Sequence, residues 1–249
     1  MGLKNFLKKY FSLRVYTKIY HLKIKIFSGG GYGAKGIDLL LIKLIKPKKN
    51  RGFYVELGAN DGIRQSNSYL LQKIYKWNGL LIEPSPIKFR ECLENRSFFP
   101  KASIYCAACV DFEYKKDFVA IEDSDLMSIA KDLDIDNDLV KKHADCGKQF
   151  LENKEYRITY GALAKTLTDL LKECNSPKNI DFLSIDVEGN ELSVLKGLDF
   201  NLYHPLRILL EVHNCKRIEI YDFLKQKSYK EEIILNENDF YKEILFKKV

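Results

Sequence analysis

The hydrophobic positions of this chain fall into short apolar runs that alternate with stretches of helical periodicity. Short continuous apolar runs indicate strands buried on both faces of a sheet, whereas apolar residues three and four apart indicate amphipathic helices. This alternation predicts strands at 53–57, 79–83, 103–110, 180–187 and 207–212. It predicts helices at 37–45, from about 68, from 85, at 167–174, from 191 and at 217–225.

Local signals support the first helices of this series. The apolar face of the helix that begins near residue 68 contains Leu70, Leu71, Ile74 and Tyr75. Ser85 is a favoured N-cap residue, and Pro86 follows at the first helical position, where a missing N–H costs nothing. A helix is therefore expected directly after each of the first two strands.

The end of the chain changes from this alternation to a hairpin. Two apolar segments, 231–235 and 241–247, flank a polar turn at 236–239. Strands that alternate with helices and end in an antiparallel pair predict an α/β fold, a three-layer sandwich around a mostly parallel sheet. The polar, acidic stretch at about 111–157 breaks the alternation and is expected to be an insertion over the sheet.

The charge is distributed unevenly along the chain. The 249 residues are 46% hydrophobic and 30% charged, which is typical of a soluble globular protein. Residues 1–51 carry thirteen Lys and Arg and one acid, a net charge of +12, so the total of +7 leaves −5 for the rest. We therefore divide the chain into a basic arm, 1–35, and a domain, 36–249. Lys residues interrupt the apolar runs of the arm, so neither a signal peptide nor a membrane span is expected, and the cytoplasm is the expected compartment.

The basic arm has several interpretations. Its Lys and aromatic residues suit peripheral contact with an anionic membrane, or with a nucleic-acid backbone. A solvated arm or a contact within a homo-oligomer fits the same composition. Nucleic acid is not the expected partner, because the basic charge lies outside the expected catalytic domain.

A glycine fingerprint offers a rival function. Gly31, Gly33 and Gly36 have the spacing of a dinucleotide-binding loop, which would suit an NAD-dependent oxidoreductase of the Rossmann type. The preceding segment, 22–27, alternates Lys with Ile and is unlike a buried parallel strand. We therefore interpret 29–33 as a flexible joint and keep the oxidoreductase as the alternative.

Polar residues follow the first two predicted strands. Glu56 is followed by Gly58, Asn60 and Asp61, and Glu83 ends the second strand. Ligands of parallel sheets bind beyond the carboxyl ends of the strands, and glycine lets the backbone approach them closely. A carboxylate at the end of the second strand suits a ribose diol, because it can accept from two neighbouring hydroxyl groups.

A second acidic group follows the later strands. Asp186 and Glu188 share one face by their period-two spacing, as do Glu211 and His213 on the next strand. If the two strands are neighbours, the four side chains converge and suit either a general base or a hard-cation site. A hydrogen-bonded histidine without a chemical role is the alternative for His213.

The ordered motifs resemble those of the FkbM-type S-adenosylmethionine-dependent methyltransferases. They are Val55–Gly62 with Ser66 and Asn67, Leu81–Pro84, Ile180–Gly189, Glu191–Gly197 and Leu209–Val212, and they cover about residues 52–215. The resemblance implies a class I methyltransferase fold. It also implies O-methylation of a sugar hydroxyl, which we expect on a nucleotide sugar or a surface-glycan precursor.

The resemblance also implies roles for single residues. The residues expected near the methionine part of S-adenosylmethionine are Glu56, Gly58, Asn60, Asp61, Ser66 and Asn67. Glu83, with Pro84, would hold the ribose, and Asp186 and Glu188 would face the methyl-transfer centre. Family members often have His after the Glu-Gly pair, where this chain has Asn190, so His213 is the better candidate for proton transfer. Catalysis by a base and catalysis by a divalent cation such as Mg or Mn, held by Asp186, Glu211 and His213, both remain open.

Overall fold

The structure, a computed structural model, describes residues 31–97, 102–123, 129–130 and 158–249. The predictions for most of the basic arm and for most of the insertion at 111–157 lie outside these residues. Among the described helices, none has the length and apolar character that crossing a membrane requires.

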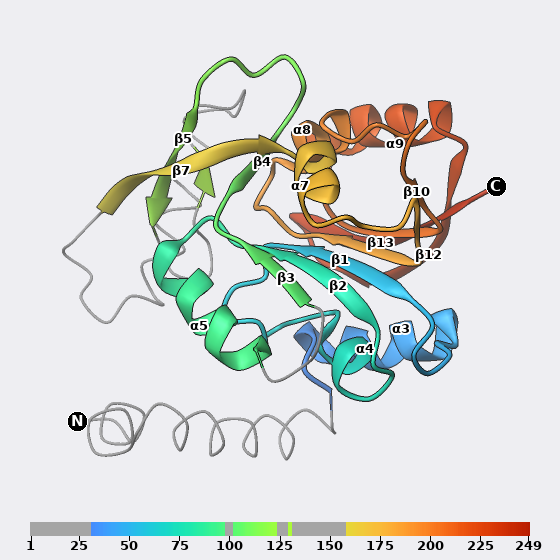
Figure 1. Cartoon of the computed structure of the whole chain (residues 1–249). Helices are drawn as coiled ribbons and strands as arrows, with labels where there is room; N and C mark the ends of the chain where they lie inside the picture. Colours follow the sequence, from blue (N-terminus) through green and yellow to red (C-terminus); the bar gives the residue numbers. More distant parts are fainter. Residues whose placement is uncertain (1–30, 98–101, 124–128, 131–157) are drawn as a thin grey trace.

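A seven-stranded sheet forms the centre of the molecule (Figure 1). Its order is β12 (Tyr229–Glu237), β13 (Tyr241–Lys248), β11 (Arg207–His213), β9 (Phe182–Ile185), β1 (Phe53–Leu57), β2 (Asn78–Ile82) and β3 (Ala102–Tyr105). Strand β13 is antiparallel to both of its neighbours, and the other adjacent pairs are parallel. The predicted mostly parallel sheet with a C-terminal hairpin is confirmed.

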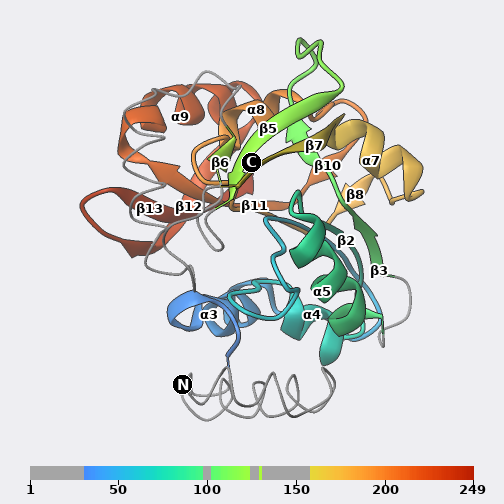
Figure 2. The same ribbon diagram turned by 90° about the vertical axis from the view of Figure 1, so that its left-hand side faces the viewer.

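Helices cover both faces of this sheet (Figures 1 and 2). One layer contains α3 (Ile37–Ile45), α4 (Tyr69–Lys73) and α5 (Pro86–Arg96), and the other contains α7 (Leu167–Glu173), α8 (Glu191–Lys196) and α9 (Arg217–Gln226). Successive side chains of a strand point to opposite faces, so Val55 packs toward α7, α8 and α9 while Tyr54 packs toward α3, α4 and α5. The three-layer sandwich is therefore confirmed as well.

A smaller sheet lies beside the carboxyl ends of the central strands (Figure 1). It contains β4 (Ala108–Val110), β7 (Ile158–Thr166), β5 (Phe118–Asp123) and β6 (Ile129–Ala130). The single strand predicted at 103–110 is wrong, because its first half pairs with β2 and its second half pairs with β7. Residues 106–107 separate the halves, so the apolar run passes from one sheet to the other. Hydrophobic pattern alone does not distinguish these two environments.

Two shorter elements also differ from the prediction. The strand expected at 180–187 begins as a two-residue strand, β8 (Asn179–Ile180), which pairs with β10 (His204–Pro205). After Asp181 it continues as β9. Ile74 was expected on a buried helix face, but it is 54% exposed because α4 ends at Lys73 and the chain turns away toward Trp77.

The glycine-rich segment before α3 packs against the domain wherever it is described. The Tyr32 ring is buried, and its backbone N–H donates to Asp38 at 2.6 Å. A Cβ atom added to Gly31 or Gly33 would lie 2.7 or 2.8 Å from atoms of Asp38. The prediction of a flexible joint is thus wrong for residues 31–33. The short 3-10 helix Ala34–Gly36 then leads into α3.

Candidate active site

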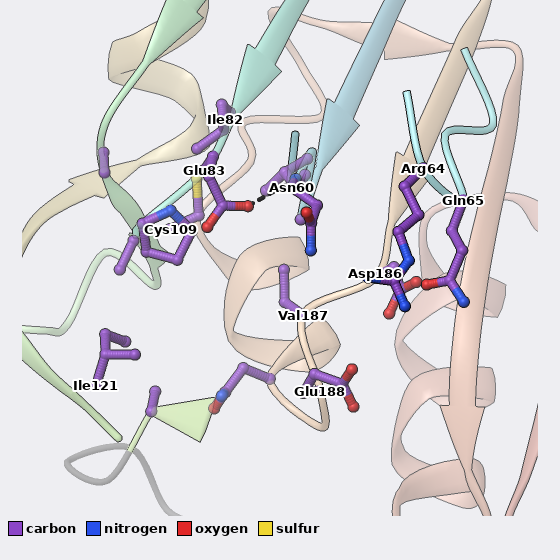
Figure 3. Close-up of a pocket in the computed structure, with 17 residues that line it drawn as sticks. Asn60, Arg64, Gln65, Ile82, Glu83, Cys109, Ile121, Asp186, Val187 and Glu188 are labelled. Atoms are coloured by element: carbon purple, nitrogen blue, oxygen red, sulfur yellow. Dashed lines mark hydrogen bonds between the residues drawn. The ribbon is translucent and has the colours of Figure 1, made fainter. Parts of the chain in front are cut away.

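A cleft of about 920 Å³ opens between the carboxyl ends of β1, β2 and β9 and the small sheet (Figure 3). Its central-sheet walls are Leu57, Gly58, Asn60, Arg64, Gln65, Ile82, Glu83, Pro84, Asp186, Val187, Glu188 and Asn190. Its small-sheet wall is Ala107, Ala108, Cys109, Ile121 and Ala130. The cleft lies where parallel sheets bind ligands, beyond the carboxyl ends of the strands.

The turn after β1 approaches the end of β9 very closely. Gly58 has φ +73°, and a Cβ atom there would lie 1.9 Å from the carbonyl oxygen of Asp186. Only glycine fits both the dihedral angle and the space. The N–H groups of Gly58 and Ala59 both donate to the Ile82 carbonyl at 3.1 Å, which ties this turn to the end of β2.

Two side chains shape the rest of this turn. Asn60 adopts φ +48°, and its side-chain oxygen accepts from the Asp61 N–H at 2.7 Å. The Asp61 carboxylate accepts from the N–H groups of Ile63 and Arg64 at 2.9 and 2.7 Å. Asp61 therefore holds the turn by local hydrogen bonds and does not line the cleft.

Glu83, which follows β2, contacts the same turn through its side chain. Its two carboxylate oxygens accept from the backbone N–H groups of Asn60 at 2.8 Å and Ser85 at 2.9 Å, the first of which is dashed in Figure 3. These bonds fix the carboxylate at the edge of the cleft between two loops. Because a carboxylate oxygen accepts more than one hydrogen bond, Glu83 can also accept from ligand hydroxyl groups.

Glu56 occupies a different place from the one that its motif suggested. Strand alternation directs its side chain away from the cleft, into the layer of α4 and α5, where it is buried. Its carboxylate accepts from the hydroxyl groups of Ser66 at 2.8 Å and Ser68 at 2.6 Å, and from the Asn67 N–H at 2.6 Å. These bonds anchor the segment that follows the Gly58 turn.

Arg96, the last residue of α5, completes this buried group. Its side chain is fully buried and donates to Glu56 at 3.3 Å, Ser68 at 2.7 Å and Gln72 at 2.7 Å. Its guanidinium group also lies 5.1 Å from the ring centroid of Tyr69. Sequence reasoning missed Arg96; the one signal was its i, i+4 spacing from Cys92, which faces the same interior.

Carboxylates crowd together at the ends of β9, β11 and β13. His213 Nε2 lies 3.1 Å from Glu211 Oε1, and ligand atoms of Glu188, Glu211 and His213 lie within 4.8 Å of one another. Glu243 of β13 pairs directly with Glu211 in the sheet register. The first residue of α8, Glu191, is fully buried, and its Oε1 accepts from the Gly189 N–H at 3.0 Å.

Burial and like charge change the proton affinity of this acidic cluster, which comprises Asp186, Glu188, Glu191, Glu211 and Glu243 with His213. Burial, with the charges of Glu211 and Glu188 next, raises the pKa of Asp186 well above its usual value. Burial also raises the pKa of Glu191 to about 7, and burial with the Glu211 charge raises that of Glu243 to about 7. For His213 burial acts in the opposite direction, but its contact with Glu211 and the surrounding carboxylates raise its pKa overall.

The structure brings together about half of the residues expected at the site. Gly58, Asn60, Glu83, Pro84, Asp186 and Glu188 line the cleft. Glu211 and His213 lie beside Glu188. Glu56, Asp61, Ser66 and Asn67 do not line the cleft, and none of the fingerprint glycines Gly31, Gly33 and Gly36 does. Glu191 and Glu243 were not expected, because the sequence did not show that α8 and β13 would meet at this corner.

The cleft has the features that a nucleoside-bearing methyl donor requires. A carboxylate held by two backbone N–H groups faces it at the end of β2. A glycine turn leaves room for close approach at the end of β1, and apolar groups from Ile82, Cys109 and Ile121 form a surface suited to a base. These residues fit S-adenosylmethionine.

Residues 56–231 match the family model described as the methyltransferase FkbM domain. The chain belongs to the FkbM family of S-adenosylmethionine-dependent methyltransferases. The match spans all of the cleft-lining residues, and the sheet order described above is a class I methyltransferase fold.

Individual relatives of this FkbM chain are distant. Methyltransferase 1 of Beauveria bassiana (strain ARSEF 2860) is 25% identical over 159 residues, which are 62% of this chain and 61% of the relative. The chain therefore spans less than two thirds of that relative. The crystal structure of methyltransferase FkbM from Methylobacillus flagellatus KT is 12% identical with a TM-score of 0.48, over 94% of this chain and 60% of that one. The precorrin-6y C5,15-methyltransferase from Geobacter metallireducens GS-15 is 9% identical with a TM-score of 0.47, over 86% and 88%.

Proposed function

We propose that this FkbM protein transfers a methyl group from S-adenosylmethionine to a sugar hydroxyl, on a nucleotide sugar or a surface-glycan precursor. The observation that carries the proposal is the division of one cleft into two chemically different sides. Glu83 and the Gly58 turn lie on one side, and Asp186 with the acidic cluster lies on the other. The first side suits a donor nucleoside and the second suits a hydroxyl group that must lose a proton.

On the donor side, Glu83 and Pro84 would hold the ribose, and Gly58 and Asn60 would border the methionine part. When bound, the sulfonium supplies an activated methyl group, so the protein needs to align the acceptor and remove its proton. Glu56 and Asp61 act indirectly in this proposal, by holding the turn that carries Gly58 and Asn60.

On the acceptor side, Asp186 and Glu188 border the cleft, and His213 stands behind Glu188. When Nε2–H of neutral His213 donates to Glu211 Oε1 at 3.1 Å, the ring can accept a proton at Nδ1, and Glu211 orients the ring and stabilises the cation that forms. Asn190, buried and lining the cleft, has no group that accepts a proton at neutral pH. The proton-accepting role therefore falls to His213 or a neighbouring carboxylate.

The pH dependence follows from the direction of the His213 shift. Its pKa is raised, so a larger fraction of the imidazole is protonated near neutral pH than in an isolated histidine. A base that must be neutral then becomes active as the pH rises through this raised pKa. We expect turnover to increase from pH 6 to pH 8 and to respond less to pH in His213→Gln.

The decisive experiment compares two ligands on three proteins. Calorimetry with S-adenosylhomocysteine and with NAD(H) is carried out on wild type, Glu83→Ala and Glu94→Ala, an exposed glutamate on α5. We expect wild type and Glu94→Ala to bind S-adenosylhomocysteine and Glu83→Ala to bind it at least 100-fold more weakly, because two charge-assisted hydrogen bonds to ribose are lost. Binding of NAD(H) without S-adenosylhomocysteine would overturn the proposal.

The acceptor class is tested separately. Nucleotide sugars and their lipid-linked products are incubated with enzyme and donor, and a mass increase of one methyl group is sought. Methylation of a sugar hydroxyl supports the acceptor assignment. Turnover with amines or RNA, and with none of the sugars, would contradict it while leaving the donor assignment intact.

A further inference from the structure

We propose that Glu188, Glu211 and His213 bind one divalent cation at the acceptor side of the cleft. The set differs from the one expected from the sequence, which contained Asp186 in place of Glu188. The catalytic role of this ion rests on the proposed O-methyl transfer, whereas the binding of the ion does not.

The three ligand atoms have spacings that one ion can bridge. His213 Nε2 and Glu211 Oε1 are 3.1 Å apart, and Glu188, Glu211 and His213 each have one ligand atom within 4.8 Å of those of the other two. With metal–ligand bonds of about 2.1 Å, neighbouring ligands of an octahedral ion lie about 3.0 Å apart and opposite ligands about 4.2 Å apart. The trio therefore needs only a small contraction to surround a cation. Two carboxylates and an imidazole suit Mn²⁺ or a similar ion.

The charges around the trio also favour a cation. Asp186, Glu191 and Glu243 all interact electrostatically with Glu211, so five carboxylates share one corner of the fold. Lys35 is the cation that acts on Glu243, and it is hydrogen-bonded to Asn236 at 2.8 Å. Lys35, His213 and Arg64, which points toward Asp186 (Figure 3), carry fewer positive charges than the five carboxylates carry negative ones. Bringing these carboxylates together costs free energy that a divalent ion would offset.

A second, independent observation comes from Glu191. Its side chain is 0% exposed, and within the described part of the chain its Oε2 has no hydrogen-bond partner. Buried carboxylate oxygens are normally satisfied, so an unpaired one indicates a missing ligand such as an ion or its water. The other oxygen of this carboxylate, Oε1, accepts from the N–H of Gly189, the neighbour of Glu188, and His213 is the charged group that acts on Glu191 most strongly, so the carboxylate lies beside the proposed site.

The position of the site gives the ion a function. Glu188 both lines the cleft and belongs to the trio, so a cation there would border the space for the acceptor. A divalent ion that contacts an acceptor hydroxyl lowers its pKa and leaves Asp186 to receive the proton. Asp186 lies in the cleft wall, with Arg64 and Gln65 pointing toward it (Figure 3).

The test measures the binding of metal ions in the absence of a methyl donor. Mn²⁺ is titrated into donor-free protein and followed by electron paramagnetic resonance and calorimetry, for wild type, Glu211→Gln, His213→Gln and Glu219→Gln. Glu219 is a matched control, because the same charge is removed from a side chain that is 56% exposed on α9. We expect one Mn²⁺ per chain in wild type and Glu219→Gln, and at least tenfold weaker binding in the other two variants. No binding at millimolar Mn²⁺, or equal binding in all four proteins, would overturn the site.

A parallel titration separates the two proposals. S-adenosylhomocysteine is added to the same four proteins, with circular dichroism to confirm that each is folded. Donor binding without Mn²⁺ binding overturns the cation site and leaves the methyltransferase proposal standing. Mn²⁺ binding that is lost only in Glu211→Gln and His213→Gln supports the site whether or not the donor binds.

Discussion

The acidic residues near the carboxyl ends of the central strands include two groups that differ in their hydrogen-bond partners. Glu56 and Glu83, at the ends of β1 and β2, accept from serine hydroxyls, backbone N–H groups and, for Glu56, a buried arginine. The group at β9, β11 and β13 instead contains carboxylates that face one another.

The difference separates carboxylates that are held mainly by hydrogen-bond donors from carboxylates that lie close to one another. A carboxylate surrounded by donors is stable without a ligand and can position a turn or a ribose. Crowded carboxylates raise one another's pKa values, and their mutual repulsion lowers the stability of the ligand-free protein. Such groups are suited to receiving a proton or a cation during the reaction.

The strongest way to break the first group is to remove its arginine. Arg96→Met leaves Glu56 as a buried carboxylate without its cationic partner, and we expect a loss of about 3–5 kcal/mol in the free energy of unfolding. Urea unfolding measures this loss. Arg90→Met, on the exposed side of the same helix, is the control and should change stability by less than about 0.5 kcal/mol. Similar losses in both variants would show that the buried group does not depend on Arg96.

The close packing between the two groups can be tested at Gly58, where the turn after β1 contacts the backbone of Asp186. Gly58→Ala places a methyl group against the Asp186 carbonyl at a positive φ, so we expect roughly 2–3 kcal/mol of destabilisation and at least tenfold weaker S-adenosylhomocysteine binding. Gly36→Ala is the control, because Gly36 has φ +75° with no atom near its Cβ position. It should lose about 1 kcal/mol and keep its donor affinity. An equal loss in both would mean that backbone strain alone matters.

The smallest expected effect comes from removing one negative charge from the second group, at Glu243. Burial and the charge of Glu211 raise its pKa from 4.5 to about 7, so the folded protein binds more protons than the unfolded chain between these values. Stability should therefore fall as the pH rises through this range. Glu243→Gln should flatten that fall and stabilise the ligand-free protein at pH 7.5 by about 1–2 kcal/mol.

Thermal melting of wild type and Glu243→Gln at pH 5, 6 and 7.5 measures this effect. Glu237→Gln, on the other strand of the same hairpin, is the control. The pKa of Glu237 is lowered by its hydrogen bond from Lys242, so its replacement should not stabilise the protein at any of these pH values. If Glu243→Gln lowers the melting temperature at pH 7.5, the acidic cluster is not under electrostatic strain.

The sequence predicted most elements of the central sheet and its helices, because buried strands and amphipathic helices leave periodic apolar patterns. It also predicted the cleft residues Gly58, Glu83 and Asp186, since each follows a recognisable apolar strand. It did not predict the break at 106–107, because both halves of that strand are equally apolar. The prediction that Glu56 lines the cleft was wrong for a related reason. A motif shows the position of a residue along a strand, but it does not show which side of the sheet the cleft occupies.

The amino-acid sequence by itself determined the family, the order of the strands along the chain and the acidic residues at their ends, because these properties are local. The tertiary structure alone decided which of those residues share a site. Arg96 reaches Glu56 across 40 positions, and Glu243 meets Glu211 only because β13 inserts beside β11. Hydrogen bonds and electrostatic repulsion depend on distances of a few ångströms, and only the folded chain fixes such distances between residues far apart in sequence.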